Sequence, residues 1–317
     1  MIIYPIVLVA FFISMLIFFR IASHYNIVDH PNERSSHNER TIRGGGVVFL
    51  FAAVVAVIMH HEYWLPITGL FVIGIISFID DLITLSNRIR ILIHLAAVSL
   101  LFIYINAFSL PIYEWLILYF IVIGTINAYN FMDGINGITG AYSLVVLGGI
   151  QYVNLYQITF VNEDMIWLPM LACCVFLFFN YRKKARCFAG DVGSVTIASW
   201  IVMLLIKLVL ITDNWSYVLF LAVYGTDSVS TIVHRISLKQ NVFKAHRFHL
   251  YQIMVNEQKF SHLKVALGYA LLQAIIISFI IIYPSQATFG LFTIILLPLL
   301  IIYILLKSIF MKKITIK

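Results

Sequence analysis

Long apolar runs recur along the whole chain, and no other feature constrains its fold as strongly. Many approach the roughly 20 residues that an α-helix needs to cross a bilayer core. Lipid offers backbone groups no hydrogen-bond partner, and the alternating segments of about 10 residues typical of a membrane β-barrel do not occur. Hydrophobic residues make up 62% of the chain and charged residues 11%, whereas soluble domains carry about 25% charged residues. The sequence therefore predicts an all-α, polytopic integral membrane protein.

We predict about eleven transmembrane helices in a single domain that covers residues 1–317, because no repeat or linker divides the chain. No basic residue precedes the first apolar run and Arg20 follows it, which favours a retained helix over a cleaved signal peptide. The expected spans are residues 2–22, 44–61, 63–79, 90–108, 112–129, 138–158, 165–181, 193–211, 215–233, 263–283 and 287–309.

Lysine and arginine residues gather on one side of this topology. Of the 21, 20 fall in the loops 20–43, 80–90, 180–190 and 233–264 and in the C-terminal tail, and Lys207 is the exception. Cytoplasmic loops of multi-pass proteins carry an excess of basic residues, so we expect the N-terminus outside and the C-terminus in the cytoplasm. The formal net charge of +7 is then a topology signal, and nucleic acid is not an expected partner.

Carboxylates mark three places at the predicted cytoplasmic edge of the membrane. Asp80 and Asp81 end an apolar run. Asp133 lies in a segment rich in Asn and Gly, and Asp191 lies in a Gly-Asp-x-Gly-Ser sequence. An aspartate at bilayer depth costs roughly 3 kcal/mol on insertion scales, so their meeting at one face predicts a site for a divalent metal and phosphate. Helix capping is the alternative for Asp80, Asp81 and Asp191.

Three asparagines accompany Asp133 in the sequence. Asn127, Asn130 and Asp133 are spaced three residues apart, so neighbouring members lie close together on a helix surface. Asn136 stands between two glycines, where a broken helix end would expose backbone groups as ligands. An ordinary Gly/Asn turn between two spans is the alternative.

Two cytoplasmic loops add basic and glycine residues. In the first, three consecutive glycines would let a phosphate approach the backbone, and arginines pair with phosphate oxygens. In the second, His246, Arg247 and His249 suit a phosphate group or a metal, with incidental histidines as the alternative. The first is predicted to be a phosphate-binding loop, with a flexible basic loop as the alternative; its candidate residues are Arg34, His37, Arg43, Gly44 and Gly45.

Together these motifs resemble the polyprenyl-phosphate N-acetylhexosamine-1-phosphate transferases of glycosyltransferase family 4, which include the phospho-MurNAc-pentapeptide translocase. The motifs occur in the family's order from about Asp29 to Gln252. The segment from His246 to Gln252 is most similar to the bacterial branch that starts O-antigen.

The resemblance implies a role for each matching residue. Asp80 and Asp81 match a tandem acidic pair, and Asp191 matches an aspartate near the metal and diphosphate, so these three are the expected catalytic residues. Asp133, with Asp191, is the expected Mg²⁺ ligand, and Mn²⁺ is an alternative metal. Phe188 matches an aromatic that stacks on uracil. The other expected nucleotide- and sugar-binding residues are Asn127, Asn130, Asn136, His246, Arg247 and His249.

The chain also departs from the family's pattern. Asn136 stands where many members have a second aspartate, and Ile42 and Lys184 replace prolines. The segment from residue 180 to residue 191 is one residue longer than usual, and Ala198 replaces a glycine. We therefore expect local differences in the nucleotide and sugar pocket.

The resemblance implies transfer of a sugar 1-phosphate from a UDP-N-acetylhexosamine to undecaprenyl phosphate, with release of UMP, as the first membrane step of O-antigen or a similar cell-surface polysaccharide. It places the protein in the bacterial inner membrane, with the active site on the cytoplasmic face. The protein could form a homodimer, and the reaction could proceed by a single or a double displacement. A secondary transporter, which also has intramembrane acids and broken helices, is the alternative function.

Overall fold

Helices account for most of the described chain. The computed structural model describes residues 3–29, 40–241, 246–283 and 288–315. Within these ranges the only sheet is an antiparallel pair of two-residue strands, in which Val28 lies opposite Ile42. In chain order the elements are α1 (Ile3–His24), β1 (Val28–Asp29), β2 (Thr41–Ile42), α2 (Val47–Met59), η1 (His61–Tyr63), α3 (Trp64–Leu82), α4 (Asn87–Tyr104), η2 (Ala107–Ser109), α5 (Ile112–Met132), α6 (Ile138–Tyr156), α7 (Asp164–Asn180), α8 (Gly190–Thr212), η3 (Trp215–Leu221), α9 (Ala222–Ser237), α10 (Leu250–Gln252), the π-helical η4 (Ile253–Glu257), α11 (His262–Ile282) and α12 (Thr288–Thr315).

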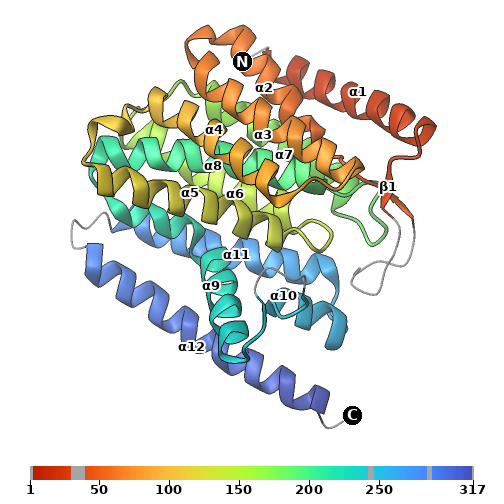
Figure 1. The fold of residues 1–317 in the computed structure, drawn as a ribbon, viewed down its shortest axis with the longest axis vertical. Coiled ribbons are helices and arrows are strands. Elements are labelled where there is room, and N and C mark those ends of the chain that lie inside the picture. The colour runs from red at the N-terminus through yellow and green to blue at the C-terminus, as the bar shows by residue number, and fades with distance from the viewer. Residues whose placement is uncertain (1–2, 30–39, 242–245, 284–287, 316–317) are drawn as a thin grey trace.

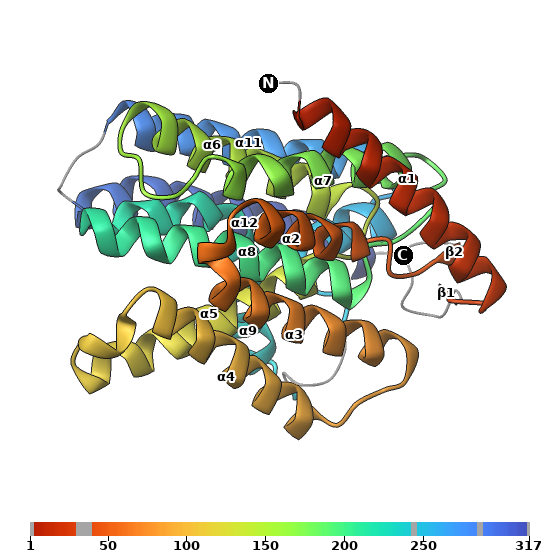
Figure 2. The same cartoon turned by 90° about the horizontal axis from the view of Figure 1, so that it is seen from above.

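Most of the helices run side by side in one bundle, as Figures 1 and 2 show. In the described residues, 9 helical segments are long and apolar enough to cross a membrane, and α2 and α7 are shorter apolar helices. Each expected span coincides with one of these segments. The prediction of an all-α, polytopic membrane protein is therefore confirmed, and the count of eleven crossings stays a prediction.

Apolar side chains face the bundle or the bilayer according to their position on each helix. On α1 the buried residues Val7, Phe11, Met15, Phe18 and Ala22 recur every three or four positions, so they form one stripe. The other faces of the same helix carry exposed isoleucines and leucines. Lipid accommodates such a face, whereas a water-soluble protein rarely exposes one of this size.

α8 is the central helix of the bundle, and it packs against α2, α3, α5 and α6. Trp200 on α8 is fully buried, and its indole N–H donates to the Met165 carbonyl at 2.8 Å. Where α2 and α8 begin, Gly46 and Gly193 lie backbone against backbone, so a Cβ on either glycine would overlap the other. This close approach fixes the start of α8 against the glycine run.

Loops from distant parts of the chain meet at one end of the bundle, on the right of Figure 1. The chain turns sharply there because Gly137, before α6, has a φ of +86°, and Gly190, at the start of α8, has a φ of +70°. Glycine adopts these angles without steric cost. The strand pair, the α5–α6 turn, the start of α8 and α10 share this end, which the distribution of basic residues predicts to be cytoplasmic.

α9 leaves the bundle and runs toward α12, which packs against α9 and η4 (Figure 1). Asp227 of α9 is only 2% exposed, so its carboxylate needs partners inside the protein. It accepts hydrogen bonds from the Leu250 amide at 3.0 Å and the Tyr269 hydroxyl at 2.7 Å, and it lies 3.3 Å from His249 Nδ1. These contacts attach the start of α10 to α9 and α11.

Candidate active site

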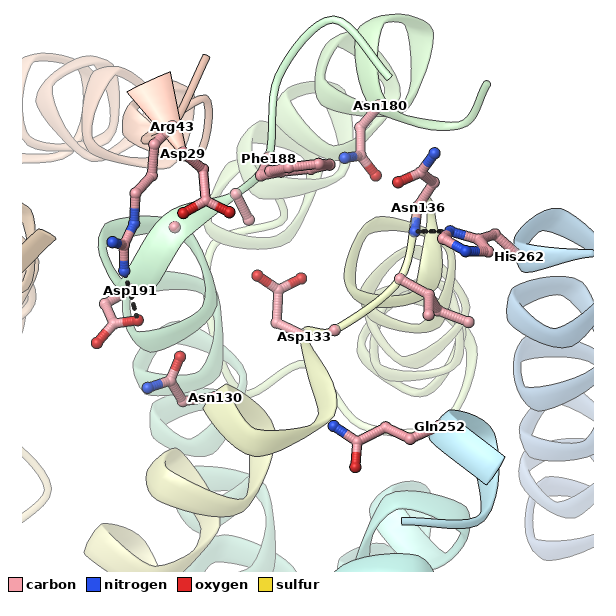
Figure 3. Close-up of a pocket in the computed structure, with 14 residues that line it drawn as sticks. Asp29, Arg43, Asn130, Asp133, Asn136, Asn180, Phe188, Asp191, Gln252 and His262 are labelled. Atoms are coloured by element: carbon pink, nitrogen blue, oxygen red, sulfur yellow. Dashed lines mark hydrogen bonds and ion pairs between the residues drawn. The ribbon is translucent and has the colours of Figure 1, made fainter. Parts of the chain in front are cut away.

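A cavity of about 270 Å³ opens among the loops at this end of the bundle. Its wall combines the strand pair, the end of α5, the 134–136 turn, the start of α8, and single residues of α7, α10 and α11. Figure 3 shows the side chains gathered around it. The predicted site residues that line it are Arg43, Asn130, Asp133, Asn136, Phe188 and Asp191.

Asp133 lies directly after α5, in the middle of this group of side chains (Figure 3). Its Oδ1 accepts a hydrogen bond from the Thr139 hydroxyl at 2.5 Å. Burial raises the pKa of Asp133 from 3.8 to about 6; the charge of Asp191 acts in the same direction, while the Thr139 hydrogen bond and Arg43 oppose it. A cation beside Asp133 would offset both the burial and the neighbouring negative charge.

Asp81 connects two acidic motifs from behind the cavity. Its carboxylate accepts the backbone N–H groups of Asp191 at 3.1 Å and Val192 at 3.3 Å, which are free N-terminal amides of α8. Asp81 Oδ1 also pairs with Arg43 Nη2 at 2.6 Å, and that nitrogen lies 3.8 Å from Asp191 Oδ1. The Asp81 side chain is 1% exposed and that of Asp191 is 25% exposed. The Asp191 side chain therefore lies at the cavity, and the buried Asp81 carboxylate holds the Asp191 backbone from the side away from the cavity.

Asp80 has partners on the other side of its helix end. It accepts the Leu85 N–H at 2.7 Å and pairs with Arg90 at 3.4 Å, so it organises the loop before α4. Neither Asp80 nor Asp81 lines the cavity. The catalytic role of this pair stays a prediction. Capping accounts only for the bonds from Asp81 to the α8 amides, since Ser86 is the N-cap of α4 and both aspartates also pair with arginines.

The glycine run uses its amides within the protein. Gly45 N–H donates to the Phe188 carbonyl at 2.8 Å, and Gly46 N–H donates to the Ala189 carbonyl at 3.0 Å. Phe188 N–H in turn donates to the Ile42 carbonyl at 2.8 Å. These bonds form a short ladder between the two loops, and this ladder holds Phe188 at the cavity.

The predicted phosphate-binding loop is thus only partly placed at the cavity. Arg43 lines it, whereas Gly44 and Gly45 do not. Arg34 and His37 lie outside the described residues. Phosphate binding by this loop stays a prediction that rests on Arg43.

The paired asparagines separate in the structure. Asn130 lines the cavity, and its Oδ1 accepts the Ser194 hydroxyl at 2.6 Å, which ties α5 to α8. Asn127, one turn earlier, donates to the Ile123 carbonyl of its own helix at 2.8 Å and does not line the cavity. Only Asn130 is placed to contact a bound ligand directly.

Amide and imidazole groups form another side of the cavity. Asn136 Nδ2 donates to a loop carbonyl at 2.8 Å, and its backbone N–H donates to His262 Nδ1 at 3.3 Å (Figure 3). Because Nδ1 accepts, a neutral His262 ring carries its proton on Nε2. Asn180 spans this side, since its Oδ1 accepts the Gly137 N–H at 2.6 Å and its Nδ2 donates to the Cys187 carbonyl at 2.8 Å.

The histidine motif supports the cavity from outside. His249 is the N-cap of α10, is 2% exposed and faces Asp227. Burial, together with nearby positive charges, lowers the pKa of His246 to about 4, so this ring is neutral at pH 7. His246, Arg247 and His249 do not line the cavity, and their role in nucleotide or sugar binding stays a prediction. The motif instead builds α10, which presents Gln252 to the cavity.

Sequence reasoning did not count four polar cavity residues as site residues: Asp29, Asn180, Gln252 and His262. The first three lie at the ends of sequence segments that contain the motifs, so their position next to a motif could have identified them as site residues. His262 begins α11 outside any motif, and only the folded chain brings it beside Asn136.

Asp133 and Asp191 are the residues best placed to hold a divalent cation. Both carboxylates line one cavity, with the Asn130 amide nearby. Mg²⁺ is usually bound by one or two carboxylates together with waters and substrate phosphates. Across the ranges that the structure describes, no cluster of three or more His, Cys, Asp or Glu forms a metal site. This donor set fits an ion shared with a phosphorylated substrate.

Comparison with known proteins shows that the chain is similar to sugar-phosphate transferases. The model of glycosyl transferase family 4 matches residues 63–209. A phospho-N-acetylmuramoyl-pentapeptide-transferase of Thermotoga neapolitana is 25% identical over 236 residues, which cover 68% of this chain and 74% of the relative. A probable undecaprenyl-phosphate N-acetylglucosaminyl 1-phosphate transferase of Bacillus subtilis is 26% identical over 275 residues, which cover 77% of this chain and 76% of the relative. The family match includes Asp80, Asp81, Asp133 and Asp191.

Proposed function

From its similarity to glycosyl transferase family 4, we propose that the chain transfers a sugar 1-phosphate from a UDP-sugar to undecaprenyl phosphate. The products are undecaprenyl-diphosphate-sugar and UMP. The relatives' names support the group that moves, a phospho-N-acetylmuramoyl or N-acetylglucosaminyl 1-phosphate group, and one of them names undecaprenyl phosphate.

The observation that carries the proposal is the meeting of Asp133, Asp191 and Arg43 at one cavity. These residues come from three distant parts of the chain and lie at the same end of the bundle (Figure 3). A guanidinium pairs well with phosphate oxygens, and two carboxylates suit a divalent ion. Together they match the two needs of a diphosphate, which are charge neutralisation and positioning.

The reaction breaks one bond of the donor diphosphate. An oxygen of the acceptor phosphate attacks the β-phosphorus, and the bond from this phosphorus to the bridging oxygen breaks, so that the bridging oxygen leaves on UMP. When bound, Mg²⁺ would be held by Asp133 and Asp191 and would neutralise charge on the diphosphate. Arg43 pairs with phosphate oxygens, and Asp81 positions its guanidinium at 2.6 Å. A phosphate monoester is largely ionised at pH 7, so the acceptor needs little deprotonation.

The nucleotide occupies the side of the cavity formed by Phe188, Asn136 and His262. An aromatic face stacks on a pyrimidine, and amide or imidazole N–H groups pair with its carbonyls. The donor sugar is an N-acetylhexosamine. The product starts a cell-surface polysaccharide, O-antigen or similar, at the cytoplasmic face of the bacterial inner membrane, where the lipid phosphate reaches the site while its tail stays in the bilayer.

Product analysis tests the proposal. Purified protein is supplied with undecaprenyl phosphate, Mg²⁺ and a panel of UDP-N-acetylhexosamines, and lipid products are identified by mass spectrometry. We expect one donor to give a lipid diphosphate sugar. Asp133→Asn should abolish it, whereas Asp213→Asn, in a loop at the other end of the bundle, should leave it intact. Absence of a lipid-linked product from every donor, in folded wild type, would overturn the proposal.

A further inference from the structure

A second cavity, of about 690 Å³, lies beside the candidate active site. Leu250 and Met254 line it, whereas Gln252, between them in the chain, lines the active-site cavity. The short α10–η4 segment therefore separates the two cavities. The remaining walls come from α9, α11 and α12, and Figure 1 shows α12 diverging from α11 toward the C-terminal end.

The wall of this second cavity is mostly hydrocarbon. One end differs, because Lys259, Ser261 and Lys264 lie there, where α11 begins. Both lysine side chains are exposed. Asp227 also touches the wall, but its carboxylate is occupied by the hydrogen bonds that hold α10. The apolar wall residues are Val223, Leu250, Met254, Phe260, Val265, Gly268, Leu272, Leu299, Ile302 and Leu306.

The cavity extends along the direction of a lipid chain. An α-helix rises about 1.5 Å per residue, so the path from Lys264 to Leu272 on α11 is about 12 Å long. The path from Leu299 to Leu306 on α12 is about 10 Å by the same measure. Gly268 lies along this path, and a Cβ built there meets no atom within 4 Å. The cavity is therefore a groove that is basic at its cytoplasmic end and apolar toward the membrane interior.

We propose that this groove binds an anionic glycerophospholipid of the cytoplasmic leaflet. One acyl chain lies along α11 and α12, and the headgroup phosphate sits between Lys259 and Lys264. Basic pockets between transmembrane helices on the cytoplasmic side suit anionic lipid headgroups. A zwitterionic lipid fits less well, because its ammonium group would meet two lysines. The acceptor lipid phosphate has a different destination, since it must reach Asp133 on the far side of the α10–η4 segment.

The site is tested by lipid retention. Wild-type protein is purified in detergent and incubated with phosphatidylglycerol or phosphatidylethanolamine, and bound lipid is counted by native mass spectrometry. We expect one phosphatidylglycerol per chain to be retained. Gly268→Leu should fill the groove, and a Lys259→Gln/Lys264→Gln variant should remove the headgroup contacts, so each should reduce retention at least about tenfold. Matched controls are Gly124→Leu, where a Cβ is equally unobstructed, and Lys239→Gln on another cytoplasmic loop.

Three results would overturn the proposal. Equal retention by the groove variants and the controls would place the lipid elsewhere. Equal retention of phosphatidylethanolamine and phosphatidylglycerol would indicate ordinary boundary lipid. Displacement of phosphatidylglycerol by stoichiometric undecaprenyl phosphate would assign the groove to the acceptor. These results do not depend on transfer activity, so they are separate from a failure of the proposed reaction.

Discussion

Asp81 Oδ1 accepts the backbone N–H of Asp191 at 3.1 Å, and this bond joins two acidic motifs that are 110 residues apart in the chain. Asp81 is buried behind the cavity, while Asp191 faces into it. The first turn of α8 is thereby held by a carboxylate that also fixes Arg43. One buried acid thus positions two groups that the proposed reaction uses.

Asp81→Asn should lower both stability and transfer. The NH₂ group of the substituted side chain cannot accept a hydrogen bond from α8, and the variant lacks the carboxylate that pairs with Arg43. An α8 N–H left without an acceptor costs about 1–3 kcal/mol, so the free energy of unfolding should fall by an amount in this range. A displaced Arg43 should reduce transfer about 100-fold, the scale of a 1 Å misplacement. Thermal unfolding and product formation measure the two effects.

Asp80→Asn is the matched control. The amide oxygen of the substituted side chain could still accept the Leu85 N–H, and only the pair with the partly exposed Arg90 would be lost. We expect less than about 1 kcal/mol of destabilisation, typical of such pairs, and transfer close to wild type. Equal loss of transfer in the two variants, without loss of stability, would instead give both aspartates a direct chemical role.

Asp133 should make the metal requirement depend on pH. Its pKa in the folded protein is about 6, and metal binding needs the ionised form. As pH falls from 7 to 5, the Mg²⁺ concentration for half-maximal transfer should rise about tenfold. A requirement that stays constant between pH 7 and pH 5 would remove Asp133 from the metal site.

The same pKa has an opposite consequence for the metal-free protein. A raised pKa means that the folded state holds a proton that the unfolded chain releases between pH 4 and pH 6. Stability should therefore increase as pH falls from 7 to 5, by roughly 1.4 kcal/mol from this group. Asp133→Asn should abolish that part of the pH dependence in a thermal-unfolding series.

Tyr251 braces the backbone next to Asp133, and a pair of variants tests this contact. Its hydroxyl donates to the Phe131 carbonyl at 2.9 Å, and a Cβ on Gly134 would overlap the same hydroxyl. Gly134→Ala should therefore displace the turn and reduce transfer at least about tenfold. Adding Tyr251→Phe removes the overlapping oxygen, so the double variant should be more active than Gly134→Ala alone. Purely additive losses in the double-mutant cycle would show that the contact does not position the turn.

The predicted topology places residue 162 outside and the C-terminus in the cytoplasm. Reporter fusions that are active on only one side of the membrane, inserted after Asn162 and after Lys317, should give opposite signals. The reason is the uneven distribution of basic residues between the two sides. Signals from the same side would contradict the eleven-span arrangement.

The sequence predicted the helical class and several residues of the candidate site, because both depend on strong local signals. Apolar runs identify helices regardless of their partners. Aspartates next to glycines identified Asp133 and Asp191, which do line the cavity. The distribution of basic residues between the loops predicted that both aspartates lie at the same end of the bundle.

The sequence could not separate residues that line the cavity from residues that support it. Asp81 and Asp191 are both acids at helix ends, and only their three-dimensional contacts place one behind the other. His249 sits in a recognisable motif but is turned toward Asp227, a residue 22 positions away in the chain. His262 lies in no motif, and its contact with Asn136 joins residues that are 126 positions apart. Such long-range contacts leave no local pattern.

The most direct test of the central claim follows the β-phosphate of the donor. Purified protein receives the preferred UDP-sugar, labelled with ³²P in the β-phosphate, together with undecaprenyl phosphate and Mg²⁺. If the sugar 1-phosphate moves, the label will appear in the lipid and the released nucleotide will be unlabelled UMP. If the label instead remains on a released UDP, only the sugar has moved, and the proposed reaction at Asp133 and Asp191 is wrong.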